Sequence, residues 1–228
     1  MGVTAELDPD LHVPARGLLF DNDGVLVDSL AAVESAWTRW AHAHDLEPHQ
    51  ALSIVHGRRA VDTVALLLPE GQRAAGAQLI EDFEIEDADV VAAMAGVPAL
   101  LASLPPGSWA VVTSGTRTLA TARLRAAGIP VPEVFVTADD VAAGKPDPAG
   151  YLAAAAGLGL DPAHALVLED SPSGIAAGLA AGSPVLGIGE EALDSAAPVV
   201  VRDLAGVRWA GDGLLLPAAT VLRGPTGH

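Results

Sequence analysis

Four short apolar runs in this chain each end at a polar residue whose side chain can take part in chemistry. They are residues 17–20 before Asp21, 109–112 before Thr113, 134–136 before Thr137 and 165–168 before Glu169. Each run has the length and the continuous apolar character of a strand that is buried on both faces. Such strands constrain the fold strongly, because both faces of their sheet must be covered by other elements.

Alanine-rich segments lie between and after these runs, and a glycine follows each of them closely. The segments are residues 117–127, 148–157 and 173–181, and the glycines are Gly128, Gly159 and Gly182. A glycine just past such a segment is typical of a helix end. Alternating strands and helices predict a parallel sheet, and ligands of parallel sheets bind at the carboxyl ends of the strands. The sequence therefore predicts an α/β fold with a site at that edge.

The segment 29–95 interrupts this alternation. Its apolar residues, among them Trp37 and Trp40, recur at helical spacing, and it contains no convincing strand run. We expect an inserted helical domain at 29–95, with the core formed by 1–28 and 96–228. Pro98, after Gly96, is expected to open the first helix of the returning core.

Another apolar run, residues 198–201, follows the last of the glycine-terminated helices. We predict that this run forms an edge strand of the sheet. The tail that comes after it contains glycine and proline, and the pattern predicts no element there.

Charge and composition exclude several classes of function. The chain has 29 acidic and 12 basic residues, a formal net charge of -17, which repels nucleic acid and anionic membrane surfaces. It has no cysteine, which rules out a thiolate nucleophile, a thiolate metal site and a disulfide framework. We expect a small-molecule partner, no nucleic acid or membrane partner, and a monomer or weak homodimer.

The beginning of the chain does not look like a targeting signal. Glu6, Asp8 and Asp10 stand where a signal peptide would have a basic and then an apolar stretch. The uncharged stretch 90–116 is interrupted by glycines and prolines, which argues against a membrane helix. Cytoplasmic residence is the expectation.

The strongest motif is FDNDGVLVDS at residues 20–29. Asp21 and Asp23 are two residues apart, so an extended backbone directs both carboxylates to one side. Close carboxylates repel each other and are tolerated where a divalent cation binds or where one of them holds a proton. One can then be a nucleophile while the other acts as acid and base. An acidic turn or a calcium loop is the alternative for this motif alone.

This motif and three later ones resemble those of the haloacid dehalogenase superfamily. The later motifs are VVTSG at 111–115, GKPDP at 144–148 and LEDSPSG at 168–174. All four occur in order, and the resemblance extends from about Gly17 to Gly189. It is to the phosphatase and β-phosphoglucomutase-like branch, which implies a Rossmann-like parallel-sheet core with an all-helical cap inserted after the first motif.

The resemblance implies a role for each motif residue. Asp21 would attack phosphorus to form an aspartyl-phosphate, and Asp23 would protonate the leaving oxygen and then activate water. Mg²⁺ would be the cofactor, held by Asp21, the backbone carbonyl of Asp23 and Asp170, with Glu169 binding directly or through water. The implied phosphate-binding groups are Asn22, Ser114, the Gly115 amide and Lys145.

Each of these residues also has an ordinary structural interpretation. Ser114 could cap the following helix, and Lys145 could be an exposed loop lysine. Glu169 and Asp170 could be an acidic pair at a helix start. The order of the four motifs favours the functional interpretation in every case.

The branch contains both mutases and phosphatases, and the motif residues would serve either activity. The β-phosphoglucomutases have a His ten residues after the acid/base Asp, where this chain has Val33. They also have an Arg three residues after a cap Gly, where this chain has Ala60. The segments 56–59 (HGRR), 111–117 (VVTSGTR) and 132–138 (PEVFVTA) instead resemble hexitol-, glycerol- and deoxyglucose-phosphate phosphatases.

We therefore expect a magnesium-dependent phosphomonoesterase that acts on a small sugar or polyol phosphate. A sugar phosphate mutase and a non-catalytic binding module of the same fold are the alternatives. In the cap, His56 and one of Arg58 or Arg59 are expected to contact the substrate. The alternative for these three residues is an exposed cap loop.

Overall fold

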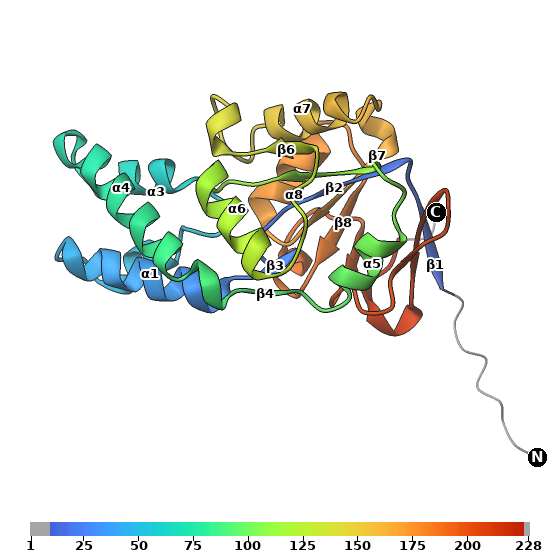
Figure 1. The fold of residues 1–228 in the computed structure, drawn as a ribbon, viewed down its shortest axis with the longest axis horizontal. Helices are drawn as coiled ribbons and strands as arrows, with labels where there is room; N and C mark the ends of the chain where they lie inside the picture. Colours follow the sequence, from blue (N-terminus) through green and yellow to red (C-terminus); the bar gives the residue numbers. More distant parts are fainter. Residues whose placement is uncertain (1–9, 226–228) are drawn as a thin grey trace, which may run out of the picture.

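The computed structural model describes residues 10–225, so Glu6 and Asp8, which bear on the expected lack of a signal peptide, lie outside it. Its centre is a seven-stranded sheet with helices on both faces, and a group of helices projects from one side (Figure 1). This arrangement confirms the predicted α/β class.

The central sheet has the order β12-β9-β8-β7-β2-β5-β6. Its strands are β2 (Gly17–Phe20), β5 (Trp109–Val112), β6 (Val134–Val136), β7 (Ala165–Glu169), β8 (Val185–Ile188), β9 (Val199–Val201) and β12 (Val221–Arg223). All neighbouring strands are parallel except β12, which is antiparallel to β9. The four strands predicted before Asp21, Thr113, Thr137 and Glu169 are therefore confirmed.

The prediction that residues 198–201 form an edge strand is wrong. β9 pairs on one side with β8 and on the other with β12, which forms the edge. The chain passes β9, makes a separate small sheet and returns to cover β9 with an antiparallel strand. An apolar run alone does not show whether a later segment will come back to pair with it.

Helices cover both faces of the sheet because alternate residues of each central strand point to opposite sides. The helices are α5 (Val97–Ser103), α6 (Arg117–Ala126), α7 (Ala149–Gly157) and α8 (Pro172–Ala180). Leu18 and Phe20 of β2 pack in the same apolar cluster as residues of α5 and α6. Leu19, between them, packs in the cluster that contains residues of α7 and α8. Pro98 stands in the first turn of α5, as predicted.

The first and last parts of the described chain form a second sheet. β1 (Leu11–Pro14), β11 (Gly213–Leu216) and β10 (Arg208–Trp209) lie in the order β1-β11-β10 with antiparallel pairing. Leu214 and Leu216 are buried in the same cluster as Leu100 of α5. The tail for which the sequence predicted no element thus extends the core.

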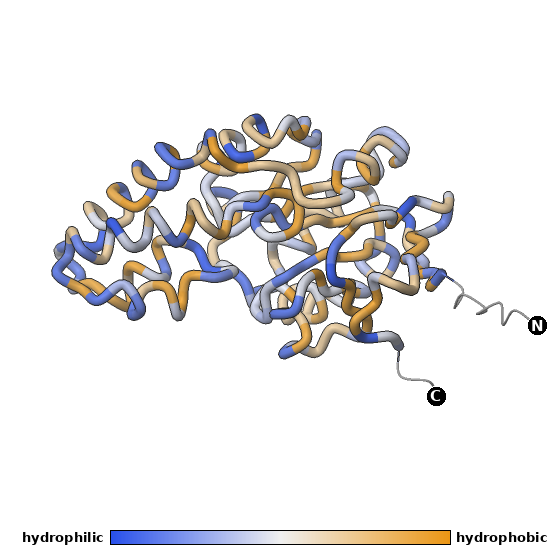
Figure 2. Tube along the Cα trace, turned by 90° about the horizontal axis from the view of Figure 1, so that it is seen from below, coloured by the Kyte–Doolittle hydropathy of each residue, from blue (hydrophilic) through white to orange (hydrophobic). Residues whose placement is uncertain are grey.

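The segment between β3 (Val27–Asp28) and β4 (Ala92–Ala93) contains α1 (Leu30–Ala43), α2 (Pro48–Leu52), α3 (Ala60–Leu67) and α4 (Glu70–Glu86). β3 and β4 pair antiparallel where this segment leaves and rejoins the core. Figure 2 shows hydrophobic and hydrophilic residues alternating along these helices. Within residues 10–225, no helix is both long enough and apolar enough to cross a membrane.

The four helices have an apolar cluster of their own, centred on Trp40. Trp40 is fully buried, stacks edge-on against Trp37 and shares the cluster with Val64 and Ile80. Its indole Nε1 donates a hydrogen bond of 2.8 Å to the carbonyl of Gly76 in α4. This residue therefore fastens α1 to α4 both by packing and by a polar contact.

Replacing Trp40 by alanine should destabilise the helical segment by about 3–5 kcal/mol, because it leaves a large cavity and removes the buried hydrogen bond to Gly76. Denaturant unfolding followed by circular dichroism measures this. The control is Leu66→Ala, in the same helical group but 64% exposed, which should change stability by less than about 0.5 kcal/mol. Equal effects of the two substitutions would contradict this view of the cluster.

Candidate active site

The two strongest acidic motifs meet because their strands are neighbours. β2 and β7 run parallel, with Phe20 opposite Leu168, so Asp21 and Asp170 follow adjacent strand ends. The backbone N–H of Asp21 donates to the carbonyl of Leu168 at 3.0 Å, which fixes the start of the Asp21 loop. Gly24 in this loop has φ +78°, and a Cβ there would lie 1.9 Å from Oδ2 of Asp170. Only glycine leaves room for that carboxylate.

Three carboxylates gather at this point. Oxygen atoms of Asp21, Glu169 and Asp170 all lie within 4.8 Å of one another. Burial, with the neighbouring Glu169 and Asp23 charges, raises the pKa of Asp21 to about 7, although Lys145 opposes the rise. Burial also raises the pKa of Asp170 well above its usual range, and the charges of Glu169 and Asp21 add to this. An all-oxygen cluster of this kind fits a hard divalent cation such as Mg²⁺.

Lys145 is the counterion of this cluster. Its Nζ lies 2.5 Å from Oδ1 of Asp21, 2.5 Å from Oε1 of Glu169 and 3.3 Å from the carbonyl of Val112. Burial would lower its pKa, but the Asp21 and Glu169 carboxylates raise it well above the usual value. With a side chain only 6% exposed, Lys145 is not an exposed loop lysine. It is a buried ammonium group beside Asp21.

Glu169 is fully buried, and hydrogen bonds occupy both of its oxygens. Oε1 accepts from Lys145 and from the hydroxyl of Tyr151 at 3.0 Å. Oε2 accepts from the backbone N–H of Ser171 at 2.9 Å and from its hydroxyl at 3.0 Å. These contacts fix Glu169 as a support for Lys145. No sequence pattern marked Tyr151, which lies among the alanines of helix α7.

The other predicted phosphate-binding groups have partners within the protein. The Ser114 hydroxyl donates to the carbonyl of Gly57 at 2.9 Å, and the Gly115 amide donates to Oγ1 of Thr113 at 3.0 Å. The Asn22 side chain is buried, and its amide donates to Oδ2 of Asp23 at 3.2 Å. Ser114 does not cap helix α6, because Thr116 does so. Phosphate would have to replace the present partners of Ser114 and Gly115.

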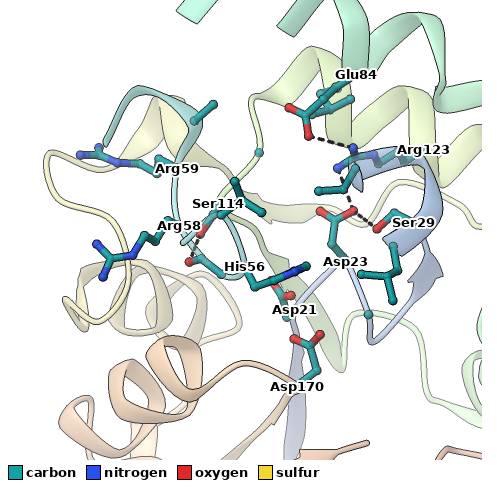
Figure 3. Close-up of a pocket in the computed structure, with 18 of the residues that line it drawn as sticks. Asp21, Asp23, Ser29, His56, Arg58, Arg59, Glu84, Ser114, Arg123 and Asp170 are labelled. Carbon is teal, nitrogen blue, oxygen red and sulfur yellow. Dashed lines mark hydrogen bonds and ion pairs between the residues drawn. The ribbon is translucent and has the colours of Figure 1, made fainter. Parts of the chain in front are cut away.

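Asp23 takes part in a charged group that the sequence analysis missed (Figure 3). Nη1 of Arg123, in α6, lies 2.8 Å from Oδ1 of Asp23, and Nη2 lies 3.1 Å from Oε1 of Glu84 in α4. The Ser29 hydroxyl also donates to Oδ1 of Asp23, at 2.6 Å. Burial raises the pKa of Glu84, and the Arg123 charge opposes this. Burial would lower the pKa of Arg123, but Asp23 and Glu84 raise it.

A sequence signal for this group existed. Glu84 continues the buried positions Gly76 and Ile80 of α4 at four-residue spacing. Arg123 likewise falls among the buried residues Leu119 and Leu124 of α6. A charged residue on the buried face of a helix needs a partner, and here the two have opposite charge. What the sequence does not show is that α4 and α6 are neighbours.

A cavity of about 420 Å³ lies between the helical segment and the core. Its walls include most of the predicted site residues, namely Asp21, Asp23, His56, Arg58, Arg59, Ser114, Gly115 and Asp170. Lys145, Glu169 and Asn22 are not among the residues of its wall. The cavity thus brings residues of three motifs and the predicted cap loop to one place, and Lys145 of the remaining motif joins them through its contact with Asp21.

The side chains of the three predicted cap residues, His56, Arg58 and Arg59, point in different directions. In Figure 3 the His56 side chain points inward, whereas the guanidinium groups of Arg58 and Arg59 point away from Asp21. Arg59 pairs with Asp62 at 2.7 Å and donates to the carbonyls of Val141 and Ala142 at 3.2 Å each. Arg59 therefore joins the cap loop to the core, and His56 is the better placed of the three to meet a substrate.

Gly57 allows this cap loop to lie against the core. It has φ +72°, and a Cβ there would lie 2.4 Å from the hydroxyl oxygens of both Ser171 and Ser173. Its carbonyl accepts the hydrogen bond from Ser114. The loop thus contacts the core within one residue of His56.

Comparison with known proteins identifies the family. Residues 15–182 match the model of haloacid dehalogenase-like hydrolases. The chain belongs to this family. It is 44% identical to hexitol phosphatase A of Escherichia coli over 76% of this chain and 82% of that protein. It is 33% identical to glycerol-1-phosphate phosphohydrolase 2 of Saccharomyces cerevisiae, over 82% of this chain and 79% of that one.

Solved structures support the fold alone. A β-phosphoglucomutase from Clostridium difficile superposes with a TM-score of 0.74 at 20% identity, covering 83% of this chain and 92% of that one. The family match and the phosphatase relatives confirm the predicted resemblance and the predicted enzyme class. This haloacid dehalogenase-like hydrolase is a phosphatase, and its named relatives act on phosphorylated hexitol or glycerol.

A Gly57→Ala variant should lower kcat/KM by about tenfold or more, because the left-handed backbone costs an L-residue about 1–2 kcal/mol and the new methyl group meets two serine hydroxyls. Steady-state kinetics measures this. The matched control is Gly71→Ala in α4, where nothing lies within 4 Å of the added Cβ and activity should not change. Equal activity of the two variants would show that the cap loop need not lie against Ser171.

Binding of a divalent cation to the Asp21, Glu169 and Asp170 cluster should release protons below neutral pH. Since the pKa of Asp21 is about 7 without metal, an ion binding at lower pH must displace its proton. Affinity should therefore fall by about tenfold or more for each pH unit below 7, since the pKa of Asp170 is raised as well. Calorimetry in buffers of different ionisation enthalpy counts the protons, and roughly one or more per ion is expected near pH 6. No proton release at that pH would contradict the assignment.

Proposed function

We propose that this phosphatase is a magnesium-dependent phosphomonoesterase that hydrolyses a small sugar or polyol phosphate through an aspartyl-phosphate on Asp21. The observation that carries the proposal is the position of Asp21. It stands at a strand end beside a buried ammonium group, faces the cavity and has Asp23 two residues away. A carboxylate that is held beside a cation and faces a cavity has the position that a nucleophile needs.

The residues divide the reaction between them. Lys145 keeps the Asp21 carboxylate oriented and compensates charge as an anionic phosphoryl group approaches. An Asp21 oxygen would attack phosphorus while Asp23 gives a proton to the leaving ester oxygen. Asp23 would then take a proton from the water that attacks phosphorus and releases Asp21. Ser114 and the Gly115 amide would bind phosphoryl oxygens after leaving their present partners.

The residues present fit Mg²⁺. Asp21 and Asp170 would ligate it with the backbone carbonyl of Asp23, and the four hydrogen bonds on Glu169 favour a contact through water for that residue. When bound, Mg²⁺ would neutralise charge on the transferring phosphoryl group. The absence of a side chain at Gly24 supports this assignment, because it lets the Asp170 carboxylate approach the Asp21 loop.

The relatives and the cavity wall support the proposed substrate class. Hexitol phosphatase A and the glycerol-1-phosphate phosphohydrolase share at least a third of their aligned residues with this chain. On the cap side of the cavity, α4 presents Gln78 and Glu81, and Glu84, on the same side, is paired with Arg123. Amide and carboxylate groups accept hydrogen bonds from hydroxyls, and carboxylates repel a second phosphate. A neutral, hydroxyl-rich leaving group suits this wall.

We propose the division into a core of residues 1–28 and 96–228 and a cap of residues 29–95. The separate cluster around Trp40 and the short β3–β4 pair at the junction support it. Such a cap can cover a bound substrate and exclude water during transfer. Magnesium as the ion, a monomeric or weakly dimeric state and a cytoplasmic location remain predictions.

The test is phosphate release from hexitol, glycerol, deoxyglucose and β-glucose-1-phosphates, with Mg²⁺ or with a chelator. We expect metal-dependent release from at least one sugar or polyol phosphate. Asp21→Asn should lower kcat by roughly 10⁴-fold or more, because it removes the nucleophile. Conversion of β-glucose-1-phosphate to glucose-6-phosphate without phosphate release would contradict the proposal in favour of a mutase. Full activity of Asp21→Asn would place the chemistry elsewhere.

A further inference from the structure

Arg123 is the most deeply buried charged residue outside the predicted motifs. Its side chain is only 3% exposed, and it lies between a core carboxylate, Asp23, and a cap carboxylate, Glu84, which is 8% exposed. Burying an ion pair costs about as much desolvation as it returns, so α4 and α6 could pack at least as well with apolar residues here. A buried ion pair can instead serve to fix the geometry of the groups that it contacts.

Arg123 contacts only one of the two carboxylate oxygens of Asp23. Oδ1 accepts from Nη1 of Arg123 at 2.8 Å and from the hydroxyl of Ser29 at 2.6 Å. Oδ2 accepts only a longer bond of 3.2 Å, from Asn22, among the described residues. Two strong donors therefore anchor Oδ1, and Oδ2 is the oxygen left available for a transferable proton.

Glu84 fixes the position of the Arg123 guanidinium group. Its Oε1 accepts from Nη2, so the planar guanidinium group is held at two of its nitrogens, one toward the cap and one toward Asp23. A planar fork fixed at both ends has little freedom to rotate. The orientation of Asp23 thus depends on a residue of the inserted helices.

We propose that Arg123 is a positioning residue that fixes Asp23 with Oδ2 as its proton-carrying oxygen, and that Glu84 holds Arg123 in place for this task. The proposal rests on the phosphatase function above. In the first step, the Oδ2 proton moves to the ester oxygen as the Asp21 oxygen bonds to phosphorus, and the electrons of the breaking P–O bond go to the leaving alcohol. The Asp23 carboxylate that remains is compensated by Arg123.

In the second step Oδ2 takes a proton from water. The water oxygen bonds to phosphorus, and the electrons of the breaking bond return to the Asp21 carboxylate. The same oxygen of Asp23 therefore gives a proton in one half-reaction and takes one in the other. Arg123 and Ser29 stay on Oδ1 throughout.

The test compares leaving groups. An alkyl phosphate needs a proton on its leaving oxygen, whereas p-nitrophenolate leaves without one. For Arg123→Lys we expect kcat/KM to fall by about 10²-fold on glycerol phosphate or hexitol phosphate and by less than about threefold on p-nitrophenyl phosphate. Asp23→Asn should show the same selectivity in larger measure. Glu84→Gln should show it in smaller measure, since one neutral acceptor still contacts Arg123.

The matched control is Arg125→Lys, an arginine exposed on the same helix, which should leave both substrates unaffected. The melting temperature of each variant shows whether it is folded. If Arg123→Lys does not fold, Glu84→Gln provides the test of the inference in its place. Arg123→Lys and Glu84→Gln could lower kcat/KM equally on both substrates while Asp23→Asn lowers it mainly on the alkyl phosphate. In that case Arg123 has only a structural role and the inference is wrong, although the phosphatase mechanism stands. If Asp23→Asn is not selective either, the proposed acid is wrong.

Discussion

The site depends on one buried ammonium group. Asp21 and Asp170 follow adjacent parallel strands, and Glu169 ends one of them, so three carboxylates are forced within 4.8 Å of one another. Two unit charges about 4 Å apart repel by roughly 4 kcal/mol at an effective dielectric constant of 20. Lys145 reduces this repulsion by contacting Asp21 and Glu169 at once. Tyr151 and Ser171 hold Glu169, and through it they hold Lys145.

Contacts between cap and core surround the cavity. Ser114 contacts the carbonyl of Gly57, and the Thr116 hydroxyl donates to Glu81 at 2.7 Å. Arg59 reaches the loop at Val141 and Ala142, and Arg123 reaches Glu84. Ser114 and Arg123, which lie in the cavity wall, thus also join the two parts. If the substrate binds as proposed, its phosphate replaces the contact of Ser114 with Gly57, which would link recognition to the position of the helical segment 29–95.

The sequence could predict the core strands because runs buried on both faces have a distinct pattern. It could also predict that Asp21, Ser114 and Asp170 would lie near one edge of the sheet, because each of them follows one of those strands. The tail was beyond prediction because β11 pairs with β1, some 200 residues earlier, and no local pattern encodes that pairing. The edge assignment of 198–201 failed for the same reason. Arg123 and Glu84 could be recognised as buried charges, but only the structure shows that their helices are neighbours.

The most direct test of the proposed mechanism is to trap the covalent intermediate. The enzyme is mixed with Mg²⁺ and a reactive hexitol or glycerol phosphate, quenched during turnover and treated with borohydride, which reduces an acyl phosphate to an alcohol. Peptide mass spectrometry then locates the reduced residue. We predict homoserine at position 21 and none at position 23. Reduction at Asp23 or Asp170, or phosphate release with no acyl phosphate at Asp21, would contradict it.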